Sequence, residues 1–291
     1  MTSTAKLSAK PVTFTGVSGN KLVGGMTGED GPPVLLLHGG GQTRHAWRKT
    51  NEVIAKLGRV AYAVDQRGHG DSEWVADGAY DFRDFAADAN VLAETLSQQT
   101  GRKPAAVGAS LGGIASMVAV GTYGQIFDAL VLVDITPRVD LDGVAKVQGF
   151  MREHAREGFA TVHEAADAVA AYLPHRPRPR SNEGLKKNLR QRADGRWYWH
   201  WDPRFLDGRR RVGPGGGEIE EMIVEAARKI KIPTLLVRGA SSELVQEKHA
   251  KDFLELVPHA SYVDVSGARH MVAGDRNDQF ANAIKSFLSD L

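Results

Sequence analysis

Cysteine is absent from the 291-residue chain. Disulfide bonds, thiolate catalysis and cysteine-based metal sites are therefore excluded, although this absence does not fix the cellular compartment. An excess of charge is absent as well, because 37 Lys and Arg residues face 35 Asp and Glu residues, for a formal net charge of +2. A chain so close to neutrality gives no general reason to expect nucleic acid as a partner.

Long apolar runs are also missing. The first six residues hold no apolar stretch of signal-peptide length. Residues 34–37, Val-Leu-Leu-Leu, are typical of the longest apolar runs, whereas a membrane span needs about 20 such residues. We therefore expect a soluble, cytoplasmic protein without a membrane partner. A chain of this length buries about three quarters of its unfolded surface, so it needs no disulfide or metal to stay folded.

The chain does contain an alternation of short apolar runs and segments with helical periodicity. The strand-type runs lie at 33–37, 60–64, 104–107, 129–133, 234–237 and 261–265, after two shorter ones near 12–14 and 21–23. The helix-type segments lie at about 45–57, 81–99, 111–120, 247–256 and 278–288. Strands without polar alternation, separated by helices, predict an α/β fold with a mostly parallel sheet that is buried on both faces.

The alternation stops between about 138 and 231. There the pattern predicts helices at 143–156, 162–172, 183–192 and 218–229, separated by joints rich in proline and glycine. We therefore divide the chain into a first core part (1–137), an inserted helical cap (138–231) and a second core part (232–291). The cap is expected to cover the site at the carboxyl ends of the strands. Its basic, proline-rich stretch at 175–180 is interpreted as a solvated joint.

The motif Gly-x-Ser-x-Gly at 108–112 joins a strand-type run to a helix-type run. In such a turn the central serine, Ser110, is lifted clear of the sheet, and its small neighbours let the chain turn sharply. Ser110 is therefore the candidate nucleophile. The amide of Leu111, at the start of the helix, and that of Gly40, in the glycine-rich loop after 33–37, are the candidate oxyanion-hole donors.

A serine hydroxyl needs a base within hydrogen-bond reach, and the base needs an orienting carboxylate. His270 stands in a loop just past the last strand-type run and is the candidate base. Asp134 and Glu243 each follow a strand-type run, and either is a candidate for the carboxylate. Asp134 is favoured because it directly ends a buried run, whereas Glu243 lies in a loop of small residues. His38 is interpreted as a structural hydrogen-bonding residue.

The cap contains an aromatic segment at 197–201, Trp-Tyr-Trp-His-Trp. Trp197, Trp199 and Trp201 are candidate substrate-binding residues whose rings would line an apolar acyl pocket. The alternative, that these rings anchor the cap onto the core, stays open. No metal site is predicted, because His163 and its neighbours on one helix face lack a further placed ligand.

Taken together, the His-Gly after a strand, the run Asp-Gln-Arg-Gly-His-Gly-Asp-Ser at 65–72, the elbow serine and the late histidine resemble the α/β-hydrolase fold superfamily. The resemblance covers about 10–137 and 232–291. It implies an eight-stranded, mostly parallel sheet with helices on both faces and an inserted cap. The 65–72 loop is similar to that of epoxide hydrolases, haloalkane dehalogenases, haloperoxidase-type esterases and carbon–carbon bond hydrolases.

The resemblance does not carry over every reaction of the superfamily. Epoxide hydrolases and haloalkane dehalogenases have aspartate at the elbow, where this chain has Ser110. The run at 133–137 resembles a subset of esterases whose acid follows this strand, which supports Asp134. Members whose acid follows the next strand support Glu243 instead, so the resemblance leaves both candidates open.

These residues predict a serine hydrolase that cleaves ester or lactone bonds of small to medium substrates with an apolar acyl part, without metal or organic cofactor. One alternative is hydrolysis of a carbon–carbon bond next to a ketone by the same triad. Another is a receptor-like protein that binds a small molecule. Activity is expected to fall at low pH, because a protonated His270 cannot act as a base. The sequence does not give the oligomeric state, and a homodimer is compatible with it.

Overall fold

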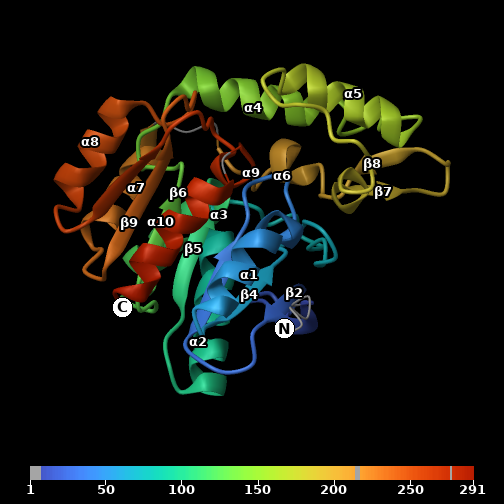
Figure 1. Cartoon of the computed structure of the whole chain (residues 1–291). Helices are drawn as coiled ribbons and strands as arrows, with labels where there is room; N and C mark the ends of the chain where they lie inside the picture. The colour runs from blue at the N-terminus through green and yellow to red at the C-terminus, as the bar shows by residue number, and fades with distance from the viewer. Residues whose placement is uncertain (1–7, 214–216, 276) are drawn as a thin grey trace, which may run out of the picture.

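The computed structural model describes residues 8–213, 217–275 and 277–291. At its centre is an eight-stranded sheet with the order β1-β2-β4-β3-β5-β6-β9-β10 (Figure 1). Only the pairings β1–β2 and β2–β4 are antiparallel, and the remaining five are parallel. The predicted α/β fold is thus confirmed. The strands are β1 (Lys10–Thr15), β2 (Lys21–Thr27), β3 (Pro33–Leu37), β4 (Val60–Val64), β5 (Ala105–Ala109), β6 (Leu130–Val133), β9 (Thr234–Gly239) and β10 (Ser261–Val265).

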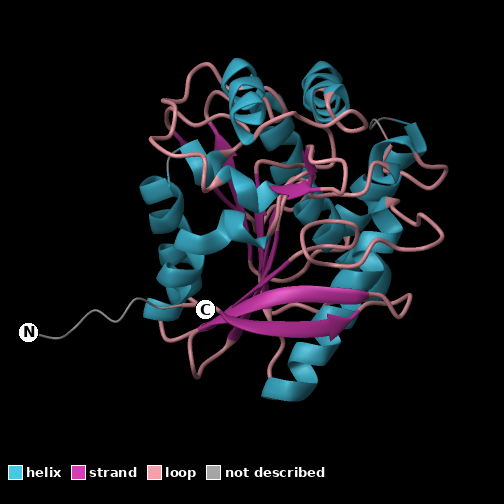
Figure 2. Ribbon diagram, turned by 90° about the vertical axis from the view of Figure 1, so that its right-hand side faces the viewer, coloured by secondary structure: helices cyan, strands magenta, loops and turns pink. Residues whose placement is uncertain are grey.

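Helices cover both faces of this sheet (Figure 2). Each face carries its own buried apolar cluster between the strands and the helices that pack on them. The helices on one face are α2 (Phe82–Thr100), α3 (Leu111–Tyr123), α7 (Gly217–Arg228) and α8 (Glu247–Leu256), and those on the other are α1 (Arg48–Lys56) and α10 (Asn277–Ser289). The molecule is therefore built of three layers, with the sheet in the middle.

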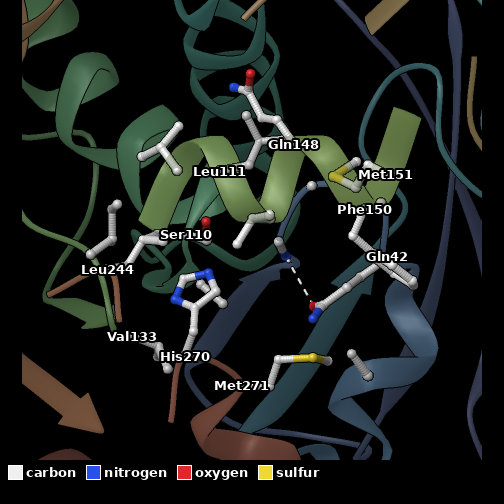
Figure 3. A pocket seen from close by; sticks show the side chains of 18 of the residues that line it. Gln42, Ser110, Leu111, Val133, Gln148, Phe150, Met151, Leu244, His270 and Met271 are labelled. Carbon is white, nitrogen blue, oxygen red and sulfur yellow. Dashed lines mark hydrogen bonds between the residues drawn. The ribbon is translucent and has the colours of Figure 1, made fainter. Parts of the chain in front are cut away.

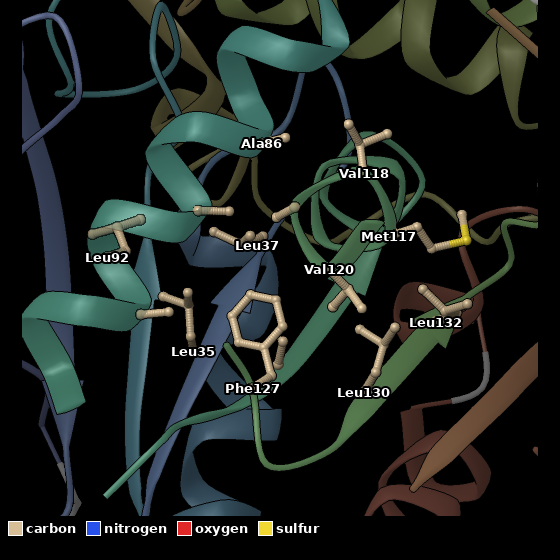
Figure 4. Close-up of a cluster of buried hydrophobic side chains, with 14 of the residues drawn as sticks. Leu35, Leu37, Ala86, Leu92, Met117, Val118, Val120, Phe127, Leu130 and Leu132 are labelled. Atoms are coloured by element: carbon tan, nitrogen blue, oxygen red, sulfur yellow. The ribbon is translucent and has the colours of Figure 1, made fainter. Parts of the chain in front are cut away.

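Strand β3 contributes to both clusters, because successive residues of a strand point to opposite faces. Leu35 and Leu37 pack on the face of α2 and α3, in the cluster that includes Met117 (Figure 4). Val34 and Leu36 pack on the face of α1 and α10. All five residues of β3 are buried, which explains why the sequence of this strand lacks polar alternation.

Capping residues fix the ends of the long helix α2. The Asp81 side chain accepts hydrogen bonds from the amides of Arg83 and Asp84, and the Asp84 side chain accepts one from the amide of Asp81. At the other end Gly101 has a φ of 70°, a left-handed conformation that suits glycine. Helix α2 therefore begins and ends close to the range expected from its periodicity.

The segment between β6 and α7 (Gly217–Arg228) lies over the carboxyl ends of the parallel strands. Figure 1 shows helices α4 and α5 above the core, with the β7–β8 hairpin beside them. The ordered parts of this segment before α7 are α4 (Leu141–Glu153), α5 (Val162–Tyr172), the 3-10 helix η2 (Leu185–Asn188), β7 (Leu189–Gln191), β8 (Trp197–Trp199) and α6 (Arg204–Asp207). The division into core and cap remains a prediction, and residues 1–7 of its first part lie outside the described residues.

The predicted helix at 183–192 is wrong. Its first half is the short η2 turn, and its second half is β7, which pairs with β8 in an antiparallel hairpin. The hairpin turns at Gly195, whose φ is 79°, directly after Asp194, and an Asp-Gly pair favours such a turn. The Arg192 guanidinium also stacks 3.8 Å from the Tyr198 ring centroid, a contact that joins the two sides of the hairpin.

Helix α7, predicted as part of the cap, packs instead on α3 within a helical layer of the core. A Cβ atom on Gly121 of α3 would lie 2.5 Å from the Cβ atom of Ala226. Ile223 and Ala227 of α7 are buried in the same cluster as Met117. Among the described residues, none of the helices combines the length and the apolar composition that a membrane span requires.

Candidate active site

Ser110 occupies a sharp turn between β5 and α3. Its backbone has a φ of 46° and a ψ of −110°. Such a conformation in a residue other than glycine costs about 1–3 kcal/mol, which the surrounding structure must offset. Gly108 and Gly112 allow the turn, because a Cβ atom on Gly108 would lie 2.4 Å from the carbonyl oxygen of Gly112, and one on Gly112 would lie 2.2 Å from that of Leu37.

His270 lies in the loop between β10 and α9 (Val272–Asp275), and its Nδ1 atom is 2.7 Å from Oδ2 of Asp134. Asp134 directly follows β6 and is fully buried. Its Oδ1 accepts a hydrogen bond from the amide of Gly239 at 2.9 Å, and its Oδ2 accepts one from the Ser242 hydroxyl at 2.5 Å. With Nδ1 directed at this carboxylate, the remaining ring nitrogen of His270 is left for the pocket.

The structure brings Asp134, and not Glu243, together with His270. Within the described residues Glu243 makes no hydrogen bond to His270, and its Oε2 is buried without a hydrogen-bond partner. Its carbonyl oxygen instead packs on Gly143 of α4, where a Cβ atom would lie 2.2 Å away. The sheet explains the difference: Asp134 is fixed at the end of β6, whereas Glu243 stands four residues beyond β9, in a loop turned toward α4. This geometry favours Asp134 over Glu243 as the orienting acid, and the assignment stays a prediction.

Ser110 and His270 line one cavity of about 550 Å³. Figure 3 shows the imidazole ring of His270 beside Ser110, with apolar side chains such as Phe150 and Leu244 around them. The nucleophile candidate and the base candidate, which are far apart in the sequence, therefore face the same space. The carboxyl ends of parallel strands meet at one sheet edge, which is how β5, β6 and the loop after β10 deliver the three side chains there.

The glycine-rich loop after β3 lies beside the nucleophile candidate. A Cβ atom on Gly39 would come 3.6 Å from that of Ser110. The amide of Gly39 donates to Oε1 of Gln42 at 3.2 Å, a bond drawn in Figure 3, and the amide of Gly41 donates to His69 at 3.1 Å. The amide of Gly40, between them, has no acceptor among the described residues.

The amide of Leu111 likewise has no acceptor within the part of the chain that the structure describes, because it belongs to the first turn of α3. Leu111 and Gly40 both line the cavity next to Ser110. Two unpaired backbone donors near a nucleophile are the arrangement that stabilises a developing oxyanion. The assignment of these two amides as the oxyanion hole stays a prediction, and the geometry is compatible with it.

The buried imidazoles of His38 and His69 form hydrogen bonds with this loop, at Gly39 and Gly41. Burial lowers the pKa of His38 to about 4 and that of His69 to about 3. The Nε2 atom of His38 accepts a hydrogen bond from the amide of Gln66, and that of His69 accepts the one from Gly41. Both rings are therefore neutral acceptors, which agrees with the structural role predicted for His38.

The run at 65–72 stabilises the loops at the carboxyl ends of the parallel strands through internal hydrogen bonds and ion pairs. Arg67 is fully buried and forms two hydrogen bonds of 2.7 Å with the carboxylate of Asp88 on α2. Asp65, at the start of the run, forms an ion pair with Arg44 and accepts a hydrogen bond from the amide of Asp71. These contacts are internal to the protein, so the run holds the loops around the site rather than contacting the cavity.

Two of the three candidate tryptophans line the cavity. Trp199 and Trp201 are buried and contribute to its wall, whereas Trp197 does not, which argues against a contact between Trp197 and substrate. Trp197 lies at the hairpin end of β8 and forms backbone hydrogen bonds with Phe159. The Trp199 ring also packs edge-on against Phe159, at a centroid distance of 5.1 Å. Trp199 therefore both lines the cavity and packs within the segment that covers it.

A contact between the cap and the histidine loop has no signal in the sequence. Arg176, in the stretch interpreted as a solvated joint, donates to the buried carboxylate of Asp275 at 2.5 Å and to the carbonyl oxygen of Met271 at 3.2 Å. The other oxygen of Asp275 accepts a hydrogen bond from the amide of Arg269. The segment predicted as the cap is thus hydrogen-bonded, through Arg176, to the chain just after His270, and Asp275 links this contact to Arg269 just before it.

The fold, the strained elbow serine and the imidazole held by a buried aspartate are together those of an α/β hydrolase. The chain belongs to the alpha/beta hydrolase fold family, whose model matches residues 32–276. It is similar to Esterase Rv0045c of Mycobacterium tuberculosis, with 30% identity over 267 residues that cover 90% of this chain and 84% of that protein. A solved structure of that esterase has a TM-score of 0.74 at 26% identity, covering 97% of this chain and 92% of the other.

A second relative is the 2-(acetamidomethylene)succinate hydrolase of Mesorhizobium japonicum, which is 29% identical over 234 residues, 78% of this chain and 77% of that protein. The crystal structure of an E-2-(acetamidomethylene)succinate hydrolase has a TM-score of 0.80 at 23% identity and covers 96% of this chain and 99% of the other. At that identity the likeness shows the shared fold.

A third relative, from Metapseudomonas resinovorans, is named 2-hydroxy-6-oxo-6-(2'-aminophenyl)hexa-2,4-dienoic acid hydrolase. It is 24% identical over 275 residues, 89% of this chain and 84% of that protein. The relatives of this chain are thus named as hydrolases of chemically different substrates.

Proposed function

We propose that this protein is a serine hydrolase that cleaves carboxylic ester or lactone bonds of small to medium substrates with an apolar acyl part. The observation that carries the proposal is the 2.7 Å contact between His270 and the buried Asp134, in a cavity that Ser110 also lines. The similarity to a protein named an esterase supports the same reaction class. A cytoplasmic location and a small-molecule substrate are part of the proposal.

In the proposed reaction the Ser110 hydroxyl attacks the acyl carbonyl while His270 takes its proton. The amides of Gly40 and Leu111 stabilise the oxyanion of the tetrahedral intermediate. His270 then gives the proton to the departing alcohol, which leaves an acyl-enzyme on Ser110. A water molecule, deprotonated by His270, attacks this ester, and the acid is released as the proton returns to Ser110. Asp134 keeps the imidazole oriented and stabilises its charged form.

Substitution of the nucleophile tests this proposal. Ser110→Ala is expected to lower turnover of p-nitrophenyl acetate, butanoate and octanoate by at least about 10⁴-fold, because the variant cannot form the acyl-enzyme. Ser97→Ala is the matched control, since the Ser97 hydroxyl donates to the carbonyl oxygen of Ala93 within α2, away from the cavity. Full activity in Ser110→Ala would refute the mechanism.

The similarity to the relative from Metapseudomonas resinovorans is the reason to test a second reaction, hydrolysis of a carbon–carbon bond next to a ketone. The name of that relative refers to a dienoic acid with a keto group, so the substrate screen also includes a vinylogous diketone. Esters are expected to be turned over faster than the diketone, because the similarity to the esterase is higher, at 30% identity. Faster, Ser110-dependent cleavage of the diketone would favour the alternative reaction.

A further inference from the structure

The cavity has exposed residues in its lining, and we take these residues to mark its mouth. Most of the other residues that line it are buried or partly buried. The exposed ones come from the 3-10 helix η1 (Arg44–Trp47) and the start of α1, from the cap around η2, and from α9. The exposed lining residues are His45, Ala46, Arg48, Gly184, Lys187 and Gly274.

The charged side chains among these exposed lining residues are basic. Arg48, from α1, and Lys187, from the cap, are both exposed. His45 of η1 and Lys187 of the cap line the same opening. Burial lowers the pKa of His45, the charges of Arg44 and Lys187 lower it further, and those of Asp65 and Asp71 raise it. The cap and the core each contribute one cation to the same opening.

The carboxylates on the η1 side, Asp65 and Asp71, are both ion-paired with Arg44 and so are not available to Arg48 and Lys187 as dedicated partners. The ion pair of Arg48 is a long one, with Glu52 at 3.9 Å, and Lys187 forms no ion pair within the described ranges. Glu220, the acidic residue that lines the cavity, is bonded to Arg138 at 3.0 Å. Because the whole chain has a net charge of only +2, this concentration of positive charge is local.

We propose that the substrate is an ester whose alcohol part carries an anionic group, such as a carboxylate or a phosphonate, held at the mouth between Arg48 and Lys187. The apolar acyl part then occupies the cavity beyond, against side chains such as Phe150, Leu206 and Val212. This inference rests on the proposed ester hydrolysis at Ser110. Because both cations are exposed, the attraction is modest and weakens as salt rises.

A series of esters that differ in charge tests the inference. The probes are butanoate esters of phenols with a para carboxymethyl, phosphonomethyl, carbamoylmethyl or trimethylammoniomethyl group, where the methylene keeps the leaving groups similar. At low salt, kcat/KM is expected to be about fivefold higher for the anionic esters than for the neutral one, and lowest for the cationic one. In 0.5 M NaCl, roughly a 4 Å screening length, the preference shrinks.

Substitutions test whether Arg48 and Lys187 cause the preference for anionic esters. The double variant Arg48→Gln, Lys187→Gln is expected to bring the ratio of anionic to neutral kcat/KM close to one. Lys285→Gln is the matched control for loss of an exposed positive charge. Lys285 lies one turn before Leu288, whose carbonyl oxygen contacts Arg59 at the start of β4, the sheet end opposite the site. An equal rate for all four esters, or a preference that the double variant keeps, would overturn the inference.

A binding measurement separates this inference from the proposed reaction. If none of the esters is hydrolysed, the proposed function fails, and binding of stable amides decides the inference. 4-Butanamidophenylacetate and the neutral 4-butanamidophenylacetamide are compared by isothermal titration calorimetry on the intact protein. At least threefold tighter binding of the anion, lost in the double variant, supports the anion site, and equal affinities contradict it.

Discussion

At the scale of single residues, backbone strain coincides with the candidate site. Ser110 and Asp134, with φ values of 46° and 49°, are the two residues other than glycine with positive φ among those described. Each directly follows a buried parallel strand, and hydrogen bonds to the neighbouring strand hold it: the Ser110 amide donates to Val133, and the Asp134 amide to Val237. The sheet thus fixes both residues where the proposed chemistry needs them.

Substitution of the two acid candidates tests which one orients His270. Asp134→Asn is expected to lower kcat by on the order of 10³- to 10⁴-fold, because the neutral amide has one acceptor oxygen, so its NH2 group would face either the Gly239 amide or the Ser242 and His270 donors. Glu243→Gln is expected to change kcat less than about threefold, since Glu243 makes no contact with His270 within the described residues. Steady-state kinetics on p-nitrophenyl butanoate measures both. A larger loss in Glu243→Gln would contradict the assignment.

Sequence reasoning singled out Ser110 and Asp134 as candidates because each directly follows a strand, and apolar runs in the sequence indicate where strands end. It did not find Ser242 and Gly239, which hold the Asp134 carboxylate. Their contacts depend on β6 lying next to β9, and these strands are separated by about a hundred residues. Nothing local in the sequence encodes that pairing, which is why the sequence leaves the choice between the two acids open.

At the scale of elements, the β5–α3 elbow depends on close backbone packing. Gly112→Ala is expected to destabilise the protein by several kcal/mol or to prevent folding, because its Cβ atom would lie 2.2 Å from the Leu37 carbonyl oxygen. Gly149→Ala, within α4, is the control: no atom lies within 4 Å of its Cβ position, so alanine is expected to stabilise by up to about 1 kcal/mol. Urea unfolding measures both, and equal midpoints would refute the packing argument.

The element that sequence reasoning misplaced lies in the cap. The segment at 183–192 has helix-forming residues, yet pairing with β8 makes its second half a strand. A strand of three residues is too short to show an alternating pattern in the sequence, so the helix-forming residues dominate the prediction. Pairing with β8 in the folded protein decides that the segment is a strand. The long helices and buried strands of the core are predicted closely, because their periodicity extends over whole elements that are packed on the sheet.

At the scale of the whole molecule, two buried imidazoles link stability to pH. In the folded protein the pKa values of His38 and His69 are about 4 and about 3, whereas a histidine in an unfolded chain has a pKa of 6.5. Below pH 6.5 the unfolded chain therefore binds more protons than the folded one. The stabilisation is complete above pH 6.5 and is lost progressively as the pH falls toward the folded values.

Between pH 7.5 and pH 5 each imidazole is expected to lower the free energy of unfolding by about 2 kcal/mol. His38→Gln removes one titrating group while its amide oxygen can still accept from Gln66, so the fall should be smaller in this variant. His163→Gln, which changes an exposed side chain on α5, is expected to keep the wild-type slope. Urea unfolding at both pH values gives the comparison. If the free energy of unfolding fell by the same amount between pH 7.5 and pH 5 in all three proteins, the proposed link between His38 protonation and stability would be contradicted.

The proposed mechanism depends above all on Ser110 as the nucleophile of a serine hydrolase. Labelling of the intact protein with a fluorophosphonate, followed by peptide mass spectrometry, tests it most directly. We expect a single stoichiometric adduct on Ser110, formed in parallel with loss of esterase activity and absent from Ser110→Ala. An active esterase that takes up no label, or that carries the label on another residue, would contradict it.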